Sequence, residues 1–496
     1  METRFSLYQL LQATGGYLRG SDSTLTSQAT LFFDKATYDS REVGPGSLFV
    51  AMRGEESDGH LYIADALARG AAGLLVRQDW ALATSSPSQL NINVPMVMVP
   101  DTLDALQNLA RWWRNQFPNL EAIGITGSVG KSSTKELIAA VLSQKFCTFK
   151  SPKNINDQQS LMPILLELRP DHQRAVIEMG AGWGLGELTR LCRVVQPRIG
   201  VELGVSHSHI GRMLTLENIA QAKAELVQAL PAEGFAVLNG DEPRTVAMAK
   251  LTQAQPFLFG LQPSFDLWAD QIESFGLEGL AFVAHYRGQA HRLRVPFVGR
   301  HFVTNLLAAC AVGLLNGLNW DEIEAGLQTR EAQVRLLVTN GPRGSTIIDD
   351  AYNASPVSMV AALDFLGDIA LAARKTVANP EVRKIAVLGD MLELGDYAPT
   401  AHEIVGRRAA HITDWLIVVG EMGREIGEAA LAQGFAPVRL ISCRDKAQAV
   451  EWLQTELKTG DYVLFKASRG MRFDEIIKAV MAEIPIQTRL SGKANS

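Results

Sequence analysis

The sequence predicts an α/β protein of three domains built mainly on parallel β-sheets, and three observations carry this prediction. The chain has 496 residues, which is enough for about three domains. Short apolar, β-branched runs alternate with helical stretches almost throughout, a pattern typical of parallel sheets with helices on both faces. A Pro-Asn break and a later Gly-Pro cluster interrupt this alternation and predict domain boundaries near residues 118 and 331.

The predicted strands fall into three groups, one for each expected domain. Residues 1–118 are expected to form a small α/β domain with a helix at 60–71, and residues 332–496 a Rossmann-like α/β domain. In parallel sheets, ligands bind beyond the carboxyl ends of the strands, so the polar residues that close each run are candidates for the functional site. The predicted strands are 47–52, 73–76 and 95–100, then 122–127, 175–180, 198–204 and 235–241, and finally 345–350, 384–390, 415–420 and 462–468.

Composition and charge narrow the class of protein. The formal net charge is −6 and no block of Lys or Arg is present, so neither a nucleic-acid partner nor a membrane-surface contact is expected. No stretch approaches about 18 uninterrupted apolar residues, and the N-terminus lacks a signal-peptide pattern, so no membrane insertion is expected. We expect a cytoplasmic enzyme whose cysteines are buried apolar residues in a reducing compartment: Cys147, Cys192, Cys310 and Cys443.

A glycine-rich loop lies in the stretch GITGSVGKSSTKE, residues 124–136. The common phosphate-loop pattern G-x-x-x-x-G-K-[ST] requires a glycine at position 125, where the chain has Ile125. A strand precedes the loop and a helix at 132–144 follows it, so backbone N–H groups and the helix N-terminus can hold phosphate oxygens. Lys131 adds a positive charge and the Ser132 hydroxyl can ligate Mg²⁺. The alternative is a tight glycine turn with a surface lysine, and the flanking elements favour the phosphate loop.

Other polar residues of the middle part follow the predicted strands. Glu178 lies at the end of one predicted strand. It is a candidate Mg²⁺ ligand, and the alternative is a surface or helix-capping glutamate. His207 and His209 alternate along an extended segment, but a zinc site would need further ligands that the sequence does not offer. Lys223, taken alone, is a solvated lysine on an amphipathic helix. The middle part, residues 119–331, is therefore expected to be a P-loop-type, ATP-binding parallel-sheet domain.

Two polar segments close strands in the last third. The segment IIDDAYNASP (347–356) places Asp350, Tyr352 and Asn353 in a turn at a strand end, which is a candidate site or an ordinary Asp/Asn/Pro turn. The segment LFKASRG (464–470) ends another strand with Lys466 and Arg469. Such a cationic strand end can take a carboxylate, and an arginine can do so with two hydrogen bonds.

Together, these motifs resemble the Mur ligases, the ATP-dependent amide-forming enzymes of peptidoglycan assembly. The family loop is T-G-[ST]-x-G-K-[ST], and TGSVGKS (126–132) fits it without a glycine at 125. DDAYNASP followed by GDMLELG is most similar to the members that join D-alanyl-D-alanine to UDP-N-acetylmuramoyl-tripeptide. Further matches run in order along nearly the whole chain: YDSREVGPGSLFVAMRGEESDGH (38–60), KNIND (153–157), VIEMG (176–180), NGDEP (239–243), GRHFVTNLLAA (299–309), VLGDMLELG (387–395) and KASRGM (466–471).

The resemblance implies a role for each matching residue. Ser40 and Arg41 would contact the uridine end of the sugar nucleotide, and Lys466 and Arg469 the incoming dipeptide or the tripeptide carboxylate. The catalytic residues would be Lys131, Lys223, His207, Asp350 and Asn353. The residues that would bind ATP are Gly127, Ser128, Gly130, Lys131, Ser132, Ser133, Asn305, Arg335 and Tyr352, with Asn305 facing the adenine.

The resemblance also implies two Mg²⁺ ions and a modified lysine. Ser132 and Glu178 would hold the first ion. His207 would help to hold the second, together with Lys223 as a carbamate, which converts a cationic side chain into a carboxylate-like group. The expected partners are the two substrates alone, and the expected oligomeric state is a monomer.

Three segments depart from the family pattern, all near the expected phosphate and metal site. SHSHIGRM (206–213) stands where the family has A-H-L-E-x-x-G-S and lacks its Glu. KNINDQQSLMP (153–163) and MGAGWGLGEL (179–188) are each one residue longer than usual. These departures leave open a divergent paralogue with another acceptor. A folylpolyglutamate-synthetase-like ligase is disfavoured by DSREVGPGSLFVAMRG (39–54), and a non-catalytic nucleotide-binding regulator by the retained lysines.

Overall fold

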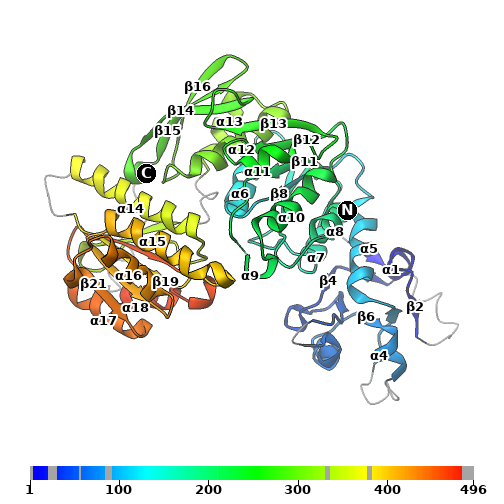
Figure 1. Ribbon diagram of the computed structural model, residues 1–496. Helices are drawn as coiled ribbons and strands as arrows, with labels where there is room; N and C mark the ends of the chain where they lie inside the picture. The colour runs from blue at the N-terminus through cyan, green and yellow to red at the C-terminus, as the bar shows by residue number, and fades with distance from the viewer. Residues whose placement is uncertain are drawn as a thin grey trace, which may run out of the picture. The chain divides into compact units, whose positions relative to one another are not determined.

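The computed structural model describes residues 4–19, 31–54, 57–83, 92–208, 210–329, 336–376 and 382–482. These residues form a mixed α/β structure with four sheets, which confirms the predicted fold class (Figure 1). The boundaries predicted near 118 and 331 remain predictions. By its internal contacts the chain forms two compact units, one of Met1–Gly124, Phe146–Gly180 and Gly186–Arg198, the other of Ile125–Lys145, Ala181–Leu185 and Ile199–Ser496.

The first part of the chain contains a five-stranded sheet. All of its strand pairs are parallel except the one between β2 and β7. Its core is formed by alternating buried residues of the strands, such as Phe49, Leu74 and Met98. In sheet order the strands are β2 (Tyr17–Leu18), β7 (Met96–Val99), β6 (Gly73–Arg77), β5 (Ser47–Val50) and β4 (Lys35–Thr37); a separate antiparallel pair is β1 (Phe5–Ser6) and β3 (Phe32–Phe33).

The second sheet has nine strands, and its order places β8 between β11 and β10. Each strand predicted at 122–127, 175–180, 198–204 and 235–241 is present. In sheet order the strands are β16 (Gln289–Val295), β15 (Leu280–Tyr286), β14 (Leu267–Ser274), β13 (Gln255–Gly260), β12 (Phe235–Asn239), β11 (Pro197–Glu202), β8 (Glu121–Thr126), β10 (Arg174–Glu178) and β9 (Thr148–Lys150).

An antiparallel extension of this sheet was not predicted. Strand β14 pairs antiparallel with β15, and β15 with β16. Strands β14 and β16 alternate between buried and exposed positions instead of forming continuous apolar runs. A sequence search for fully buried parallel strands therefore does not detect them.

Helices pack closely around the glycine loop. Helix α6 (Lys131–Leu142) begins directly after the loop and packs against α12 (Phe302–Leu315) and α13 (Trp320–Leu327). At Gly326 of α13, an added Cβ would lie 2.5 Å from the Cα of Val141, so the glycine permits this close approach. The C-terminal end of α6 is thereby held close to α13.

The last part of the chain is a six-stranded, Rossmann-like sheet with helices on both faces (Figure 1). Only the edge pair β17–β18 is antiparallel. Two separate apolar cores, one on each face, hold the helices to the sheet. In sheet order the strands are β17 (Leu337–Asn340), β18 (Thr346–Asp349), β22 (Tyr462–Lys466), β19 (Lys384–Gly389), β20 (Trp415–Val419) and β21 (Leu440–Cys443); the helices are α14 (Pro356–Thr376), α15 (Ala398–Ile412), α16 (Gly423–Ala432), α17 (Lys446–Glu456) and α18 (Asp474–Met481).

The remaining helices are short, apart from α5 and α10. Helix α10 begins at an N-cap formed by Thr215, whose side chain accepts a hydrogen bond from the N–H of Asn218. These helices are α1 (Leu7–Thr14), α3 (Ile63–Ala68), α4 (Gln78–Ala83), α5 (Thr102–Arg114), α7 (Leu161–Leu165), α8 (Glu187–Val195), α9 (Ile210–Met213), α10 (Leu216–Gln228) and α11 (Pro243–Met248).

Two observations bear on the expected environment of the chain. The Pro356–Arg374 part of α14 is long and apolar enough to cross a membrane by length and composition alone. Its residues Met359, Leu363 and Phe365 lie in the core of the last sheet, as in a core helix of a globular domain. Three of the cysteines are buried as expected, but Cys147 is exposed because it precedes the edge strand β9, so the prediction of burial was wrong there.

Candidate functional site

The glycine loop has the backbone of a phosphate loop. Gly127 and Gly130 adopt positive φ angles of 146° and 90°. A Cβ added at Gly127 would lie 2.8 Å from the Leu203 Cβ, and one at Gly130 would lie 2.5 Å from the Asn305 Nδ2, so both positions require glycine. Ile125 is fully buried within β8, which explains why the loop has no glycine there.

The loop is held in place by hydrogen bonds. The Ser128 N–H donates to the Gly204 carbonyl at 2.8 Å, and the Ser128 Oγ accepts from the Ser206 N–H at 2.8 Å. The Lys131 Nζ donates to the Gly127 carbonyl at 2.6 Å. The loop is therefore a formed cradle, and its lysine folds back over the loop, where phosphate oxygens would bind.

Asn305 braces the loop from α12. Its Nδ2 donates to the Thr134 Oγ1 at 2.7 Å and to the Gly130 carbonyl at 3.3 Å. The predicted contact of Asn305 with adenine remains a prediction, because its amide donors are already bound to the loop. Ser132 and Ser133 are buried in the first turn of α6, which carries no acidic residue to offset the positive end of the helix dipole.

Glu178 is buried at the end of β10, with 1% of its surface exposed. Its Oε1 accepts a hydrogen bond from the Asn156 Nδ2 at 2.7 Å. Its Oε2 is buried with no hydrogen-bond partner among the described residues. The alternative of a surface glutamate is therefore wrong. A buried carboxylate oxygen without a partner is costly unless a cation or donor meets it, and oxygen ligands of this kind suit Mg²⁺.

Lys223 is also buried, with 3% of its surface exposed, so the alternative of a solvated lysine is wrong. Burial and, to a smaller degree, the positive charge of Lys131 together lower the pKa of its ammonium to about 8, although Glu202 opposes both. Glu202 ends β11 and is fully buried. Burial raises the pKa of its carboxyl group, while Lys223 and Lys131 oppose that shift.

Glu202 was not singled out by the sequence analysis. Its Oε1 accepts from the Gly204 N–H at 3.0 Å, and its Oε2 has no hydrogen-bond partner in the described part of the chain. The signal was present, because Glu202 is the one charged residue inside the apolar run IGVELG (199–204). A charge inside a buried strand requires a partner.

His207 packs against the last part of the chain. Its ring stacks on Tyr397, with the ring centroids 3.8 Å apart and the planes inclined by 12°. Burial, and to a smaller degree Arg244, lowers the pKa of the His207 imidazole. Its role as a Mg²⁺ ligand stays a prediction.

The helix cap suggests a second histidine. In the pattern A-H-L-E-x-x-G-S, the Ser follows the His by six residues, and a Ser or Thr that caps a helix suits that position. Thr215 caps α10, and counting back six residues from it gives His209. His209 lies outside the described residues.

Contacts also connect α9 with the segment GDMLELG (389–395). The Gly211 N–H donates to the Glu393 carbonyl at 3.0 Å, and Arg212 lies 3.9 Å from the Glu393 carboxylate. The Arg212 guanidinium lies 3.7 Å from the ring centroid of Trp183. Two of the segments that depart from the family pattern, 179–188 and 206–213, thus contact each other.

The strand ends of the last sheet contain one buried and one exposed cation. The Lys466 Nζ donates to Asp350 at 2.6 Å and to the Asn353 carbonyl at 2.9 Å, and only 2% of the Lys466 side chain is exposed. Arg469 is exposed and lies 5.6 Å from the ring centroid of Tyr352. Of the two cations predicted to meet a carboxylate, only Arg469 is accessible to a ligand.

The residues predicted to contact uridine begin a short 3₁₀ helix, Ser40–Glu42. Ser40 is buried, while the Arg41 side chain is 82% exposed and its guanidinium contacts Asp39 at 2.6 Å. Their role in binding the sugar nucleotide stays a prediction. The predicted nucleotide ligand Arg335 lies outside the described residues.

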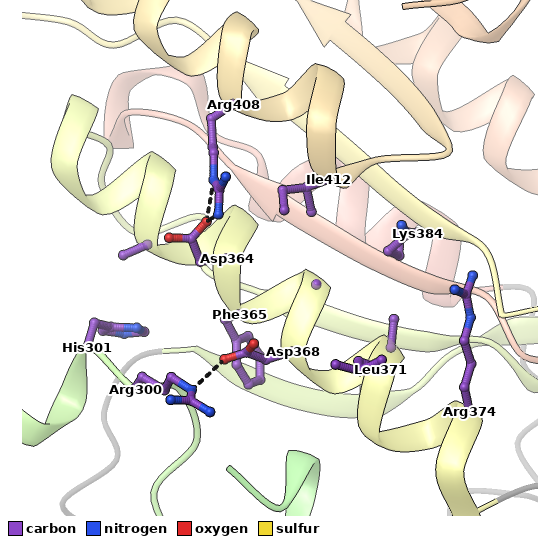
Figure 2. Close-up of a pocket in the computed structure, with 13 residues that line it drawn as sticks. Arg300, His301, Asp364, Phe365, Asp368, Leu371, Arg374, Lys384, Arg408 and Ile412 are labelled. Atoms are coloured by element: carbon purple, nitrogen blue, oxygen red, sulfur yellow. Dashed lines mark hydrogen bonds and ion pairs between the residues drawn. The ribbon is translucent and has the colours of Figure 1, made fainter. Parts of the chain in front are cut away.

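A hollow of about 520 Å³ lies elsewhere, along α14 and α15. Figure 2 shows that Arg408 meets Asp364 and Arg300 meets Asp368 across it, at 2.5 and 3.5 Å. Its lining includes none of the residues predicted for the functional site. The hollow is therefore separate from the predicted nucleotide site. Among the described residues, no group of three or more His, Cys, Asp or Glu side chains is placed to hold a metal ion without other ligands.

A phosphate loop with buried charges beside it, followed in the chain by a second, Rossmann-like sheet, is the architecture of a nucleotide-dependent ligase. Models of known protein families match three successive segments of the chain. Residues 34–114 match the Mur ligase family, catalytic domain; residues 125–313 the Mur ligase middle domain; and residues 334–469 the Mur ligase, glutamate ligase domain. The chain belongs to the Mur ligase family.

Individual relatives agree with this assignment. The chain is 35% identical over 450 residues to the UDP-N-acetylmuramoyl-tripeptide–D-alanyl-D-alanine ligase of Synechocystis, a match that covers 90% of this chain and 92% of the relative. It is 32% identical to the ligase of the same name from Bacillus subtilis, over 93% of this chain and 96% of the relative. A crystal structure of MurF from Acinetobacter baumannii is similar with a TM-score of 0.83 and 29% identity, and the match covers 97% of this chain and 99% of that one.

Proposed function

We propose that this chain joins D-alanyl-D-alanine to UDP-N-acetylmuramoyl-tripeptide, with conversion of ATP to ADP and phosphate, in the cytoplasmic assembly of peptidoglycan precursors. The observation that carries the proposal is the match to relatives of that name along about nine-tenths of the chain. The formed phosphate loop and the exposed Arg469 support it from the geometry. We propose a monomer whose partners are its two substrates.

The reaction needs an activated carboxyl group, because a free carboxylate is a poor acyl donor at neutral pH. A carboxylate oxygen of the tripeptide attacks the γ-phosphorus of ATP, and the bond to the β–γ bridging oxygen breaks to give an acyl phosphate and ADP. The amine of the dipeptide then attacks the acyl carbon, phosphate leaves, and the nitrogen loses a proton. Positioning and charge stabilisation drive such transfers.

The loop supplies the charge stabilisation. The Lys131 ammonium and the N–H groups at the start of α6 are proposed to hold the β- and γ-phosphates, with Ser128 and Ser133 as further contacts. The Lys131 Nζ donates to the Gly127 carbonyl, and phosphate oxygens would replace that acceptor. These donors are fixed before the reaction and are therefore effective where negative charge develops.

One buried oxygen near the start of this site is suited to hold Mg²⁺. The buried Oε2 of Glu178 has no hydrogen-bond partner among the described residues, and this donor fits a hard cation. From the family resemblance, we propose Ser132 and Glu178 as ligands of a first ion, and Lys223 with His207 as ligands of a second, with His209 as the alternative histidine. When bound, Mg²⁺ supplies positive charge that neutralises the transferring phosphoryl group.

The environment of Lys223 supports its proposed carbamylation. Only a neutral amine can attack carbon dioxide, and burial lowers the pKa of Lys223 to about 8, which raises the neutral fraction near neutral pH. The resulting carbamate would carry two oxygen ligands on a side chain that otherwise ends in a cation.

The acceptor is tested by a phosphate-release assay. With UDP-N-acetylmuramoyl-tripeptide and ATP, we expect rapid phosphate release on addition of D-alanyl-D-alanine and none above background with single amino acids. A preference for a single amino acid would instead support a divergent family member, which the unusual segments 153–163, 179–188 and 206–213 leave open. Release without any acceptor would contradict ligation.

A further inference from the structure

Glu202 is a buried carboxylate for which the reaction described above has no use. It is fully buried at the end of β11, and its Oε2 has no hydrogen-bond partner in the described part of the chain. A buried carboxylate with only one of its two oxygens hydrogen-bonded destabilises the folded state unless another group compensates its charge. Its surroundings therefore show what compensates it.

The packing of α10 on β11 places Glu202 opposite Lys223. A Cβ at Gly200 would lie 3.2 Å from the Leu226 Cγ, so this strand position faces that helix position. Glu202 follows Gly200 by two residues on the same face of the strand, about 7 Å toward the carboxyl end. Lys223 precedes Leu226 by three residues, which is about 4.5 Å along the helix. This displacement has the same direction as that from Gly200 to Glu202, because a helix that connects two parallel strands runs antiparallel to them.

Lys131 is the third charge of this cluster. Its ammonium stabilises the Glu202 carboxylate and disfavours the charged form of Lys223. Glu242 acts on Glu202 more weakly and with the opposite sign. With Lys223 as an ammonium, the buried Lys223 and Glu202 and the half-buried Lys131 sum to one positive charge.

Carbamylation would reverse this balance. The neutral Nζ of Lys223 donates its lone pair to the carbon of dissolved carbon dioxide, a C=O electron pair moves onto oxygen, and the nitrogen releases one proton to solvent. The three groups then sum to one negative charge, with the carbamate facing the Glu202 carboxylate. Two buried like charges repel strongly, and a divalent cation between them restores the original sum.

We propose that Glu202 is a positioning residue that makes the carbamate of Lys223 depend on a bound divalent cation, and that its free Oε2 faces this cation. The inference rests on the proposed carbamylation and adds a residue and a dependence to it. A carbamate would then form in quantity only on protein that has bound metal, and apo protein would retain a lysine ammonium paired with Glu202.

The test is ¹³C NMR of the full-length protein with ¹³C-labelled bicarbonate, with EDTA or with Mg²⁺. In the wild type we expect the carbamate signal to rise at least about fivefold on addition of Mg²⁺. In Glu202→Gln the signal should be nearly independent of Mg²⁺. Glu233→Gln, an exposed site outside the cluster, is the matched control for loss of one negative charge and should behave like the wild type.

A second measurement does not require the Glu202 variant to fold. Because linkage is reciprocal, bicarbonate must raise the affinity of the wild type for Mn²⁺, read by electron paramagnetic resonance, by the factor by which Mn²⁺ favours the carbamate. Lys223→Gln should show no effect of bicarbonate on Mn²⁺ affinity. A wild-type carbamate signal that ignores Mg²⁺, or equal Mg²⁺ dependence in Glu202→Gln, would overturn the role of Glu202 alone. No carbamate under any condition would overturn both this inference and the proposed carbamylation.

Discussion

Two buried lysines of this chain lie beside carboxylates at strand ends, and they differ in how completely their carboxylate partners are hydrogen-bonded. Lys466 donates to Asp350 at 2.6 Å and to the Asn353 carbonyl at 2.9 Å. Lys223 faces Glu202, whose Oε2 has no hydrogen-bond partner in the described part of the chain. Burial lowers the pKa of the Lys223 ammonium to about 8. The Lys466–Asp350 pair is hydrogen-bonded within the protein, whereas the Lys223–Glu202 pair leaves one carboxylate oxygen without a hydrogen-bond partner among the described residues.

The difference teaches that burial alone does not identify a chemical role. A buried ion pair with its hydrogen bonds made is chiefly structural, and removing one partner leaves an uncompensated charge. A buried pair with a free oxygen and a shifted pKa is a candidate for chemistry or metal binding. Sequence resemblance gave both Lys223 and Lys466 functional roles, and only their surroundings separate them.

The largest effect is expected at Lys131, the cation that neighbours the incomplete pair. Lys131→Ala should reduce ATP turnover by about a thousandfold, because a fixed donor at the transferring phosphate is lost. Far-UV circular dichroism and the thermal midpoint should stay near those of the wild type. Turnover close to wild type would refute the phosphate loop.

The complete pair should control stability. Lys466→Ala should lower the free energy of unfolding by about 3 kcal/mol, because Asp350 is left buried without its partner. Urea unfolding measures this change. Lys478→Ala is the matched control: its 2.7 Å pair with Asp474 is exposed and should contribute less than about 0.5 kcal/mol. Equal losses of unfolding free energy in Lys466→Ala and Lys478→Ala would contradict the structural role of the buried Lys466–Asp350 pair.

The incomplete pair should control activity. Lys223→Ala should lower kcat/KM about a hundredfold, because the proposed carbamate ligand is absent. The free energy of unfolding should fall as well, because the buried Glu202 carboxylate loses its partner, so activity is compared on folded protein. Short carboxylates such as acetate should restore part of the activity, and a failure of every carboxylate tried would count against the carbamate.

A smaller effect separates the two histidines of the segment SHSHIGRM (206–213). If the register set by Thr215 is correct, His209→Ala should weaken Mn²⁺ binding about tenfold, the lower end of the effect expected for a metal-site residue. His207→Ala should leave Mn²⁺ affinity unchanged and remove only the stack on Tyr397. Titration calorimetry with Mn²⁺ distinguishes them, and the reverse order of effects would restore His207 as the ligand.

The smallest effect is expected where α9 contacts the Glu393 loop. A Cβ at Gly211 would lie 2.9 Å from the Glu393 carbonyl oxygen and 3.0 Å from the Gly395 nitrogen. Gly211→Ala should therefore cost about 1 kcal/mol of stability through crowding against backbone. Gly184→Ala, whose added Cβ meets nothing within 4 Å, is the control. Identical thermal midpoints for both variants would show that the contact is not formed in solution.

The sequence analysis predicted most of the parallel framework. Every strand it named is present, because fully buried parallel strands have continuous apolar runs. The antiparallel strands β14 and β16 were missed because half-buried strands alternate and have no such runs. Strand β15 does have an apolar run, LAFVA (280–284), which the prediction did not include.

The loop and Glu178 could be located from pattern alone, since both follow strand ends. Glu202 and the burial of Lys223 could not be read in the same way. The charge of Glu202 was visible in its strand, but its orphaned oxygen and its position opposite Lys223 depend on how α10 packs on β11. Helix periodicity marked Lys223 as solvated because a single polar position on a helix does not reveal which face is covered.

The central claim is that Lys223 and Lys466, both buried, differ in chemistry. The most direct measurement is a crystal structure of the full chain grown with bicarbonate and Mg²⁺, at a resolution that resolves side-chain atoms. We predict planar density extending beyond the Nζ of Lys223 and none beyond the Nζ of Lys466, which should remain bound to Asp350. Two unmodified lysines in that crystal would contradict the account.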